Sequence, residues 1–276
     1  MGRGRTRGLM SRRFDGEHTV ADSDEVVVEE PMEIRLDGHL VATTMRTPGH
    51  DFELAVGFCH SDGLIDDVTV QQVRYCAAWP GGDADATAPS GRRRASDSDY
   101  NVVTVDTGGL AAIPEPRLNT VSAACGICGA PSIDQLCERL GTIATVEFPL
   151  PLLASLPDLV RPSQRLFDRT GSIHAAAAFT VDGTMVAIRE DIGRHNAVDK
   201  VVGHLRLAGQ LPATDLALFV SGRASFEMVQ KAWAAGFSAL VAVSGPSSMA
   251  VEAARAAGMT MAGFARDGKL NLYSPA

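Results

Sequence analysis

The stretch DLALFVSGRASFEMVQKAWAAGFSALVAVSGPSSMAVEAARAAGMTMAGFA, residues 215–265, decides the fold. Short runs of Val, Leu, Ala and Met alternate in it with longer segments of helical character. Strands that are apolar along their whole length are typical of a sheet covered by helices on its faces. The stretch therefore predicts an α/β domain. Its predicted strands are residues 215–221, 239–245 and 259–265, and its predicted helices are residues 225–236 and 247–258.

The same alternation continues on both sides of this stretch. Asp182-Gly183 is a turn signal between two strand-like runs, and a helical segment follows them. The sequence Ser132-Ile133-Asp134-Gln135 fits a capping box and predicts a helix to about Leu140. The C-terminal domain is therefore expected to span residues 132–276. Its further elements are strands at 174–181, 184–190 and 269–274 and a helix at 194–209.

The N-terminal half predicts a smaller, mainly-β (α+β) domain over residues 23–131. Residues 25–45 read as a hairpin because Asp37-Gly38 separates two strand-like runs. A short helix is expected between Pro48-Gly49 and Gly63. The low-complexity segment at residues 80–99 lacks apolar residues that could order it, so we expect a disordered insertion there. It lies between strand-like runs at 68–79 and 100–107.

Composition and charge exclude several classes of protein. The 276 residues carry a net charge of −8, which argues against general nucleic-acid binding because that needs a basic surface. No apolar run approaches the ~18 residues of a membrane span. The N-terminus is rich in arginine and lacks the apolar stretch of a secretory signal. We expect residues 1–22 to be a disordered basic tail and the protein to be cytoplasmic.

Two of the five cysteines, Cys125 and Cys128, lie in the glycine-rich stretch AACGICGAP, residues 123–131. Structural zinc is disfavoured because no second ligand pair has a suitable spacing, and no metal site is expected. A thioredoxin-like pair should open a helix directly after a strand, which this pair does not. Sulfur carriage suits a mobile, accessible loop best, although disulfide exchange stays open. The remaining cysteines are expected to be buried as small hydrophobic residues: Cys59, Cys76 and Cys137.

A second group of candidate residues is REDIGRHNAVDK, residues 189–200. It lies where a strand turns into a helix, a position that gathers ligand groups in α/β proteins. A solvated, salt-bridged cap would explain Glu190 or Lys200, but it explains Arg194 and His195 less well. We therefore expect Arg194 and His195 to bind a ligand or to support catalysis.

Two further strand-to-helix turns, residues 221–227 and 244–250, have the composition of phosphate-binding turns. Each offers small residues, hydroxyls and helix-start N–H groups. Neither is a Walker A or GxGxxG motif, so nucleotide hydrolysis and a Rossmann dinucleotide site are not supported. The candidate anion-binding residues are Ser221, Gly222, Arg223, Ser244, Gly245 and Ser247.

Together these motifs resemble the FdhD family, the formate dehydrogenase accessory sulfurtransferases. The resemblance covers about residues 25–275 and rests on CGICG, REDIGRHNAVDKVVG, SGRASFEMVQKA, VSGPSSMAVEAA, GFARDGKLNLY and the early TPGHDFELAVGF. It implies a cytoplasmic homodimer that receives sulfur from a cysteine desulfurase as a cysteine persulfide. It also implies that the sulfur is passed to the molybdenum of bis(molybdopterin guanine dinucleotide), bound as a substrate, before this cofactor enters formate dehydrogenase.

The resemblance also implies roles for individual residues. Cys125 would carry the persulfide, and Cys128 would take a less defined part. The C-terminal domain would be a cytidine-deaminase-like α/β sandwich, although deaminase chemistry is excluded because His174-Ala175-Ala176 lacks the required glutamate and no cysteine follows Cys137. Two alternatives remain: a molybdenum-cofactor-binding chaperone and a thiol-disulfide oxidoreductase. The implied guanine dinucleotide contacts are Phe264, Ala265, Arg266, Asp267, Gly268 and Lys269.

Overall fold

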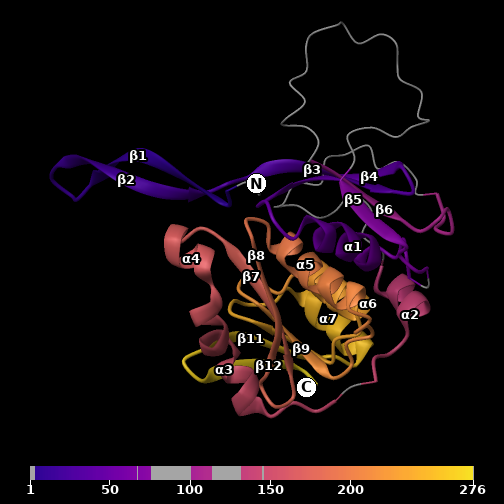
Figure 1. Cartoon of the computed structure of the whole chain (residues 1–276). Coiled ribbons are helices and arrows are strands. Elements are labelled where there is room, and N and C mark those ends of the chain that lie inside the picture. Colours follow the sequence, from indigo (N-terminus) through magenta and orange to yellow (C-terminus); the bar gives the residue numbers. More distant parts are fainter. Residues whose placement is uncertain (1–3, 67, 76–100, 114–131, 145, 276) are drawn as a thin grey trace, which may run out of the picture.

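The structure is a computed structural model (Figure 1). It describes residues 4–66, 68–75, 101–113, 132–144 and 146–275. The insertion expected at residues 80–99 lies outside the described residues, and so do Cys76, Cys125 and Cys128.

A six-stranded sheet forms the C-terminal unit, in the order β12-β11-β10-β9-β7-β8. Strands β9, β10 and β11 run parallel to one another, whereas β7, β8 and β12 join antiparallel to their neighbours. Every strand predicted after residue 170 is present. The strands are β7 (His174–Thr180), β8 (Met185–Asp191), β9 (Leu216–Val220), β10 (Ala239–Ala242), β11 (Thr260–Arg266) and β12 (Lys269–Ser274).

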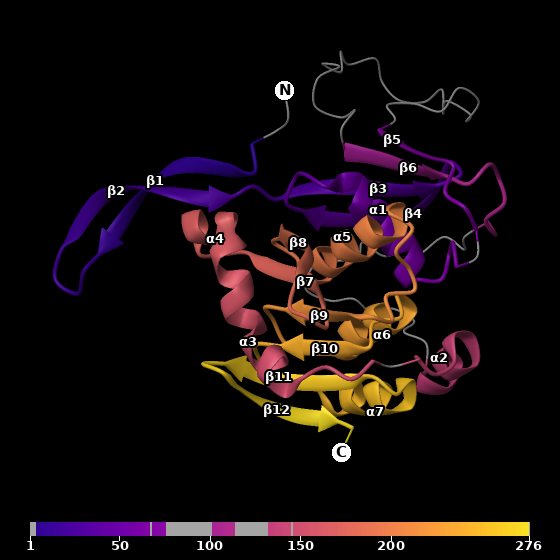
Figure 2. The ribbon, with the colours of Figure 1, turned by 60° about the horizontal axis from the view of Figure 1, so that its bottom comes forward.

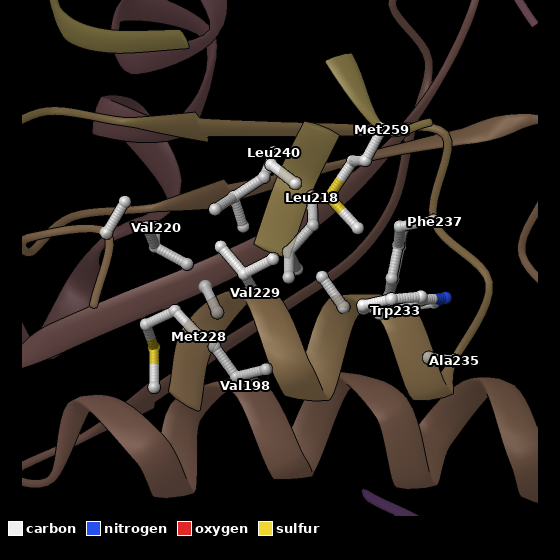
Figure 3. Packing of buried hydrophobic residues seen from close by; sticks show 14 of the residues in the cluster. Val198, Leu218, Val220, Met228, Val229, Trp233, Ala235, Phe237, Leu240 and Met259 are labelled. Carbon is white, nitrogen blue, oxygen red and sulfur yellow. The ribbon is translucent and has the colours of Figure 1, made fainter. Parts of the chain in front are cut away.

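Helices cover both faces of this sheet, which explains why the central strands β9 and β10 are apolar at every position. On one face, side chains such as Leu218 and Leu240 pack with Trp233 and Val198 from the helices (Figure 3). On the other face, Phe219 packs against Leu153. This arrangement confirms the predicted α/β class. The first face carries α2 (Ile133–Leu140), α5 (Arg194–Leu207), α6 (Phe226–Ala234) and α7 (Ser248–Ala257), and the second carries α3 (Leu150–Val160).

Helix α3 and the segment after it have no counterpart among the elements predicted from the sequence. The chain from Pro149 to Pro162 contains four prolines, which read as loop. The structure nevertheless forms α3: Pro149 is the N-cap residue and Pro151 lies in the first turn, where proline is tolerated, while Pro157 lies inside the helix. The helix buries Leu153, Leu156 and Val160 against the sheet. A short 3-10 turn (Arg161–Ser163) and α4 (Arg165–Thr170) follow.

The N-terminal unit is a four-stranded sheet, β4-β3-β6-β5, that packs on one helix. The predicted hairpin is confirmed, and its turn residues Asp37 and Gly38 have φ angles of 48° and 88°. The predicted helix is also present as α1, and it buries Leu54 and Phe58 against the sheet. The elements are β3 (Glu30–Leu36), β4 (His39–Arg46), α1 (Asp51–Ser61), β5 (Gln72–Tyr75) and β6 (Val102–Asp106).

The disordered tail expected at residues 1–22 is wrong from residue 6 onward, because residues 6–27 have regular structure. They form an antiparallel hairpin, β1 (Thr6–Phe14) and β2 (Thr19–Val27), that projects from the body of the molecule (Figure 1). Asp15 shapes its tip by accepting hydrogen bonds from the next backbone amides, and Asp15-Gly16 is the turn signal that identifies the hairpin in the sequence. Its base is tied to α4, because the Arg169 guanidinium binds Glu25 and Thr6.

The two units meet where α1 crosses α5 (Figures 1 and 2). At the crossing, a Cβ atom added to Gly57 would lie 1.8 Å from the carbonyl oxygen of Asp199. A Cβ atom added to Gly203 would lie equally close to the carbonyl oxygen of Glu53. Only glycine at both positions therefore allows the helices to approach this closely.

Over the ranges that the structure describes, no helix is long and apolar enough to cross a bilayer.

Candidate functional site

Most of the predicted ligand-binding segments come together at one edge of the six-stranded sheet. Because β9, β10 and β11 are parallel, the turns that follow them lie at the same edge. Strand β7 is antiparallel to β9 and β8, and this places His174 and its register partner Asp191 at that edge as well. Helix α5 begins there with Arg194. We call this edge the strand-end site (Figure 2).

The two serine-glycine turns lie side by side in the strand-end site. The Ser244 amide donates to the Gly222 carbonyl at 3.3 Å, and the Ser247 amide donates to the Ala224 carbonyl at 3.1 Å. The serine hydroxyls mainly hold the turns in shape. Ser221 Oγ accepts from the Ala175 amide at 2.9 Å, and Ser247 caps α7. The turns thus form a fixed floor to the strand-end site.

The segment from Phe264 to Lys269 continues this floor. The Phe264 amide donates to the Ser244 carbonyl at 3.3 Å, and a Cβ atom on Gly245 would lie 2.7 Å from the Phe264 ring. Arg266 and Lys269 are register partners of strands β11 and β12, on either side of the exposed turn that contains Asp267 and Gly268. The side chain of Ala265 is buried beneath α3, so it cannot contact a ligand from the surface.

Arg194 is the residue of the REDIGRHNAVDK motif that faces the strand-end site. Its Cδ lies 3.7 Å from the position that a Cβ on Gly222 would occupy. Its Nε is buried and has no hydrogen-bond partner among the described residues. This unused donor is suited to an anionic ligand group. His195 is buried in the first turn of α5, whereas Arg223 is exposed.

Other residues of the motif form a buried network between the two units. Lys200 Nζ lies 2.6 Å from Asp191 Oδ2 and donates to the Thr47 carbonyl at 2.9 Å. Asp191 also accepts hydrogen bonds from the Thr47 amide and from Asn196. Burial lowers the pKa of Lys200, and Asp191 opposes this effect. These residues have a structural role. The motif therefore contains both a residue that faces the candidate ligand site, Arg194, and residues that form ion pairs and hydrogen bonds within the fold.

Arg189 and Glu190 are also used structurally. Arg189 forms two hydrogen bonds with Glu53, at 2.5 and 2.6 Å. The Glu190 carboxylate accepts hydrogen bonds from the amides of Leu166 and Phe167, both at 3.0 Å, and thereby holds α4 against β8. These contacts fix the positions of α1, α4 and β8 around the strand-end site.

A cavity of about 640 Å³ opens beside the strand-end site, between the sheet and the α3–α4 segment. His174 and Ser221 contribute polar groups to its lining, and Phe219 contributes an apolar surface. Burial, followed by the positive charge of Arg194, lowers the pKa of His174. The size and the mixture of apolar and polar lining are typical of a site for a small organic molecule.

Gln164 and Phe167, which line the cavity, lie in no sequence motif. His174 stands out in the sequence only as the first residue of a strand and as a position that lacks the deaminase glutamate. The available signal is the antiparallel pairing implied by the short Asp182-Gly183 turn. That pairing brings the start of β7 beside the end of β8.

The described cysteines differ from each other. Cys59 is fully buried, as expected, and burial raises the pKa of its thiol. Cys137 is exposed on α2, so the expectation that it is buried is wrong. Helix α2 buries Leu136 and leaves the next position in the helix facing solvent.

Comparisons with known proteins agree with the resemblance found in the sequence. The FdhD/NarQ family matches residues 27–276. The sulfur carrier protein FdhD of Corynebacterium efficiens is 44% identical over 261 residues, which are 91% of this chain and 89% of that protein. The protein of the same name from Streptomyces coelicolor is 44% identical over 284 residues, 100% of this chain and 96% of that protein.

A solved structure has the same fold. It is the crystal structure of a protein from Desulfotalea psychrophila that is named as a candidate formate dehydrogenase accessory protein. The TM-score is 0.72 at 18% sequence identity, and the alignment covers 99% of this chain and 98% of that one. At this identity the likeness concerns the fold alone.

Proposed function

Because the chain belongs to the FdhD/NarQ family, we propose that it is a sulfurtransferase that serves the maturation of a formate dehydrogenase. The observation that carries the proposal is the match, along nearly the whole chain, to relatives that are named sulfur carrier proteins. We place the sulfur on Cys125, in the loop that lies outside the described residues. The protein acts in the cytoplasm, as a homodimer.

The first step is an exchange of sulfur between two proteins. The Cys125 thiolate attacks the outer sulfur of a persulfide on a cysteine desulfurase. A new sulfur–sulfur bond forms on Cys125, the donor's sulfur–sulfur bond breaks, and the donor cysteine leaves as a thiolate. No net oxidation or reduction takes place in this step.

The second substrate is bis(molybdopterin guanine dinucleotide), whose molybdenum would receive the outer sulfur before the cofactor enters formate dehydrogenase. The sulfur–sulfur bond on Cys125 breaks, Cys125 leaves as a thiolate, and reduced molybdenum supplies the two electrons that convert the transferred sulfur to a sulfide ligand. Sulfur and molybdenum are compatible as soft partners. The side-by-side turns at Gly222 and Ser244 and the unused donor of Arg194 support the strand-end site as the place that binds the phosphates. The exposed turn from Arg266 to Lys269 supplies charged groups for the guanine.

Intact-protein mass spectrometry tests the sulfur transfer. After incubation with a cysteine desulfurase and cysteine, the protein should gain about 32 Da per sulfur atom. The gain should be lost in Cys125→Ala and retained in Cys137→Ala, which removes an exposed thiol outside the loop. Cys128→Ala distinguishes a sulfur carrier from a dithiol oxidoreductase. A carrier that uses Cys125 should still gain the sulfur, whereas an oxidoreductase needs both loop cysteines. A protein that binds the cofactor but gains no sulfur would be a chaperone, and the proposal would be wrong.

Binding of GDP tests the strand-end site separately. Arg194→Ala should weaken GDP binding about tenfold, because it removes a charge-assisted donor. Asp267→Ala should weaken it as well if this carboxylate accepts from the guanine edge. Arg12→Ala is the control, since Arg12 is exposed on β1 and should not matter. Isothermal titration calorimetry that gives one dissociation constant for all four proteins would exclude the assignment.

A further inference from the structure

A second cavity, of about 590 Å³, lies between the start of the N-terminal hairpin, α4 and β8. We call it the arginine pocket. It gathers four arginines around one glutamate in a chain whose net charge is −8. The arginines are Arg5, Arg165, Arg169 and Arg189, and the glutamate is Glu190.

Two of these arginines are neutralised by carboxylates of the protein. Arg189 is held by Glu53, and Arg169 is held by Glu25. The Glu190 carboxylate is occupied by the Leu166 and Phe167 amides. These groups fix the walls of the arginine pocket and have little binding capacity left.

The other two arginines retain unused donors. Arg5 donates from one terminal nitrogen to the Glu190 carbonyl at 3.3 Å, while its Nε is buried and has no hydrogen-bond partner in the part of the chain that the structure describes. Arg165, the first residue of α4, is exposed, and within those same ranges it forms no ion pair. A buried donor without an acceptor is uncommon in a folded protein and indicates a missing partner.

We propose that the arginine pocket is a second anion site, which binds a phosphate or pyrophosphate group. Its guanidinium groups come from three separate elements and therefore approach the cavity from different directions. A phosphate presents three or four oxygens to such donors, whereas a carboxylate presents two in one plane. Arginine forks match phosphate oxygens closely.

The arginine pocket is separate from the strand-end site. Its lining residues Leu166 and Arg165 lie on α4, and the cavity beside Ser221 and His174 uses other residues of that helix, such as Phe167. Arg5 also lies outside residues 27–276, which match the FdhD/NarQ family. The proposed anion site therefore goes beyond the sulfur transfer and depends on the N-terminal hairpin.

Titration of the full-length protein with inorganic pyrophosphate tests the site. In isothermal titration calorimetry, Arg165→Ala should weaken one binding event about tenfold or more, because it removes an unpaired donor. Arg12→Ala is the control, because Arg12 is exposed on β1 and lines neither cavity. Its affinity should stay within about twofold of the wild type.

Two further titrations locate the site and identify the source of the phosphate: GDP with Arg165→Ala, and pyrophosphate with Arg194→Ala. If Arg165→Ala weakens GDP binding as well, the pocket takes a nucleotide phosphate; if it weakens only pyrophosphate, the pocket takes the free anion. Both results support the site. Loss of pyrophosphate binding in Arg194→Ala alone would place the anion in the strand-end site and overturn the proposal. Absence of pyrophosphate binding to the wild type, or equal affinity in Arg165→Ala, would overturn it too.

Discussion

At the scale of single residues, the carboxylate of Glu53 on α1 connects the two units. It receives two hydrogen bonds from Arg189 on β8, and its oxygens lie 3.1 Å from Nδ1 of both His50 and His204. Burial alone would raise the pKa of Glu53, but Arg189 and His50 lower it to about 2. An acid whose pKa falls on folding stabilises the folded state above its unfolded pKa, and this contribution is lost as the pH falls toward the folded pKa.

Glu53→Gln should therefore destabilise the protein in a manner that depends on pH. At neutral pH we expect a loss of about 1–2 kcal/mol, after allowance for solvent screening. The difference from the wild type should shrink as the pH is lowered from about 5 toward 3, where the unfolded Glu53 takes up a proton. Urea unfolding at several pH values measures this. Glu33→Gln is the control, since Glu33 forms a partly exposed pair with Arg35 and its loss should cost little. A difference that stays constant with pH would contradict the assignment.

At the scale of elements, what the sequence predicts depends on how local the signal is. The strands and helices after residue 170 follow from apolar runs and their spacing, and all are present. Helix α3 escapes prediction because its prolines obscure a buried face at Leu153, Leu156 and Val160. The N-terminal hairpin carries a local turn signal, Asp15-Gly16, but its strands are mostly exposed and lack a long apolar run, and its anchor, Arg169, lies far along the chain from Glu25. Contacts between distant residues leave no local pattern.

The crossing of α1 and α5 gives the sharpest prediction at this scale. Alanine normally stabilises a helix relative to glycine by up to about 1 kcal/mol. Gly57→Ala should instead destabilise the protein by about 3 kcal/mol or more, because its Cβ would lie 1.8 Å from the Asp199 carbonyl oxygen. Gly8→Ala is the control, since a Cβ there has no neighbour within 4 Å. Denaturant unfolding that shows Gly57→Ala to be as stable as the wild type would contradict this account of the crossing.

At the scale of the whole molecule, one motif has two separate tasks. The sequence marks residues 189–200 as a candidate site but cannot show which side chains face a ligand, because burial is decided by the N-terminal unit that packs on α5. In the structure Arg194 faces the strand-end site, whereas Asp191, Asn196 and Lys200 hold Thr47 and Met45 of the N-terminal unit. The network thus couples the ligand-facing edge to the contact between the two units.

This coupling predicts that the two units unfold together. Calorimetry of the wild type should show one transition whose measured and van't Hoff enthalpies agree. Lys200→Met leaves Asp191 buried without its cation, and we expect a loss of about 3–5 kcal/mol that lowers the midpoint of the single transition. The double variant Lys200→Met/Asp191→Asn removes both charges and should recover part of this loss. Two separated transitions in the wild type, or a double variant no more stable than Lys200→Met, would mean that the buried pair does not join the units.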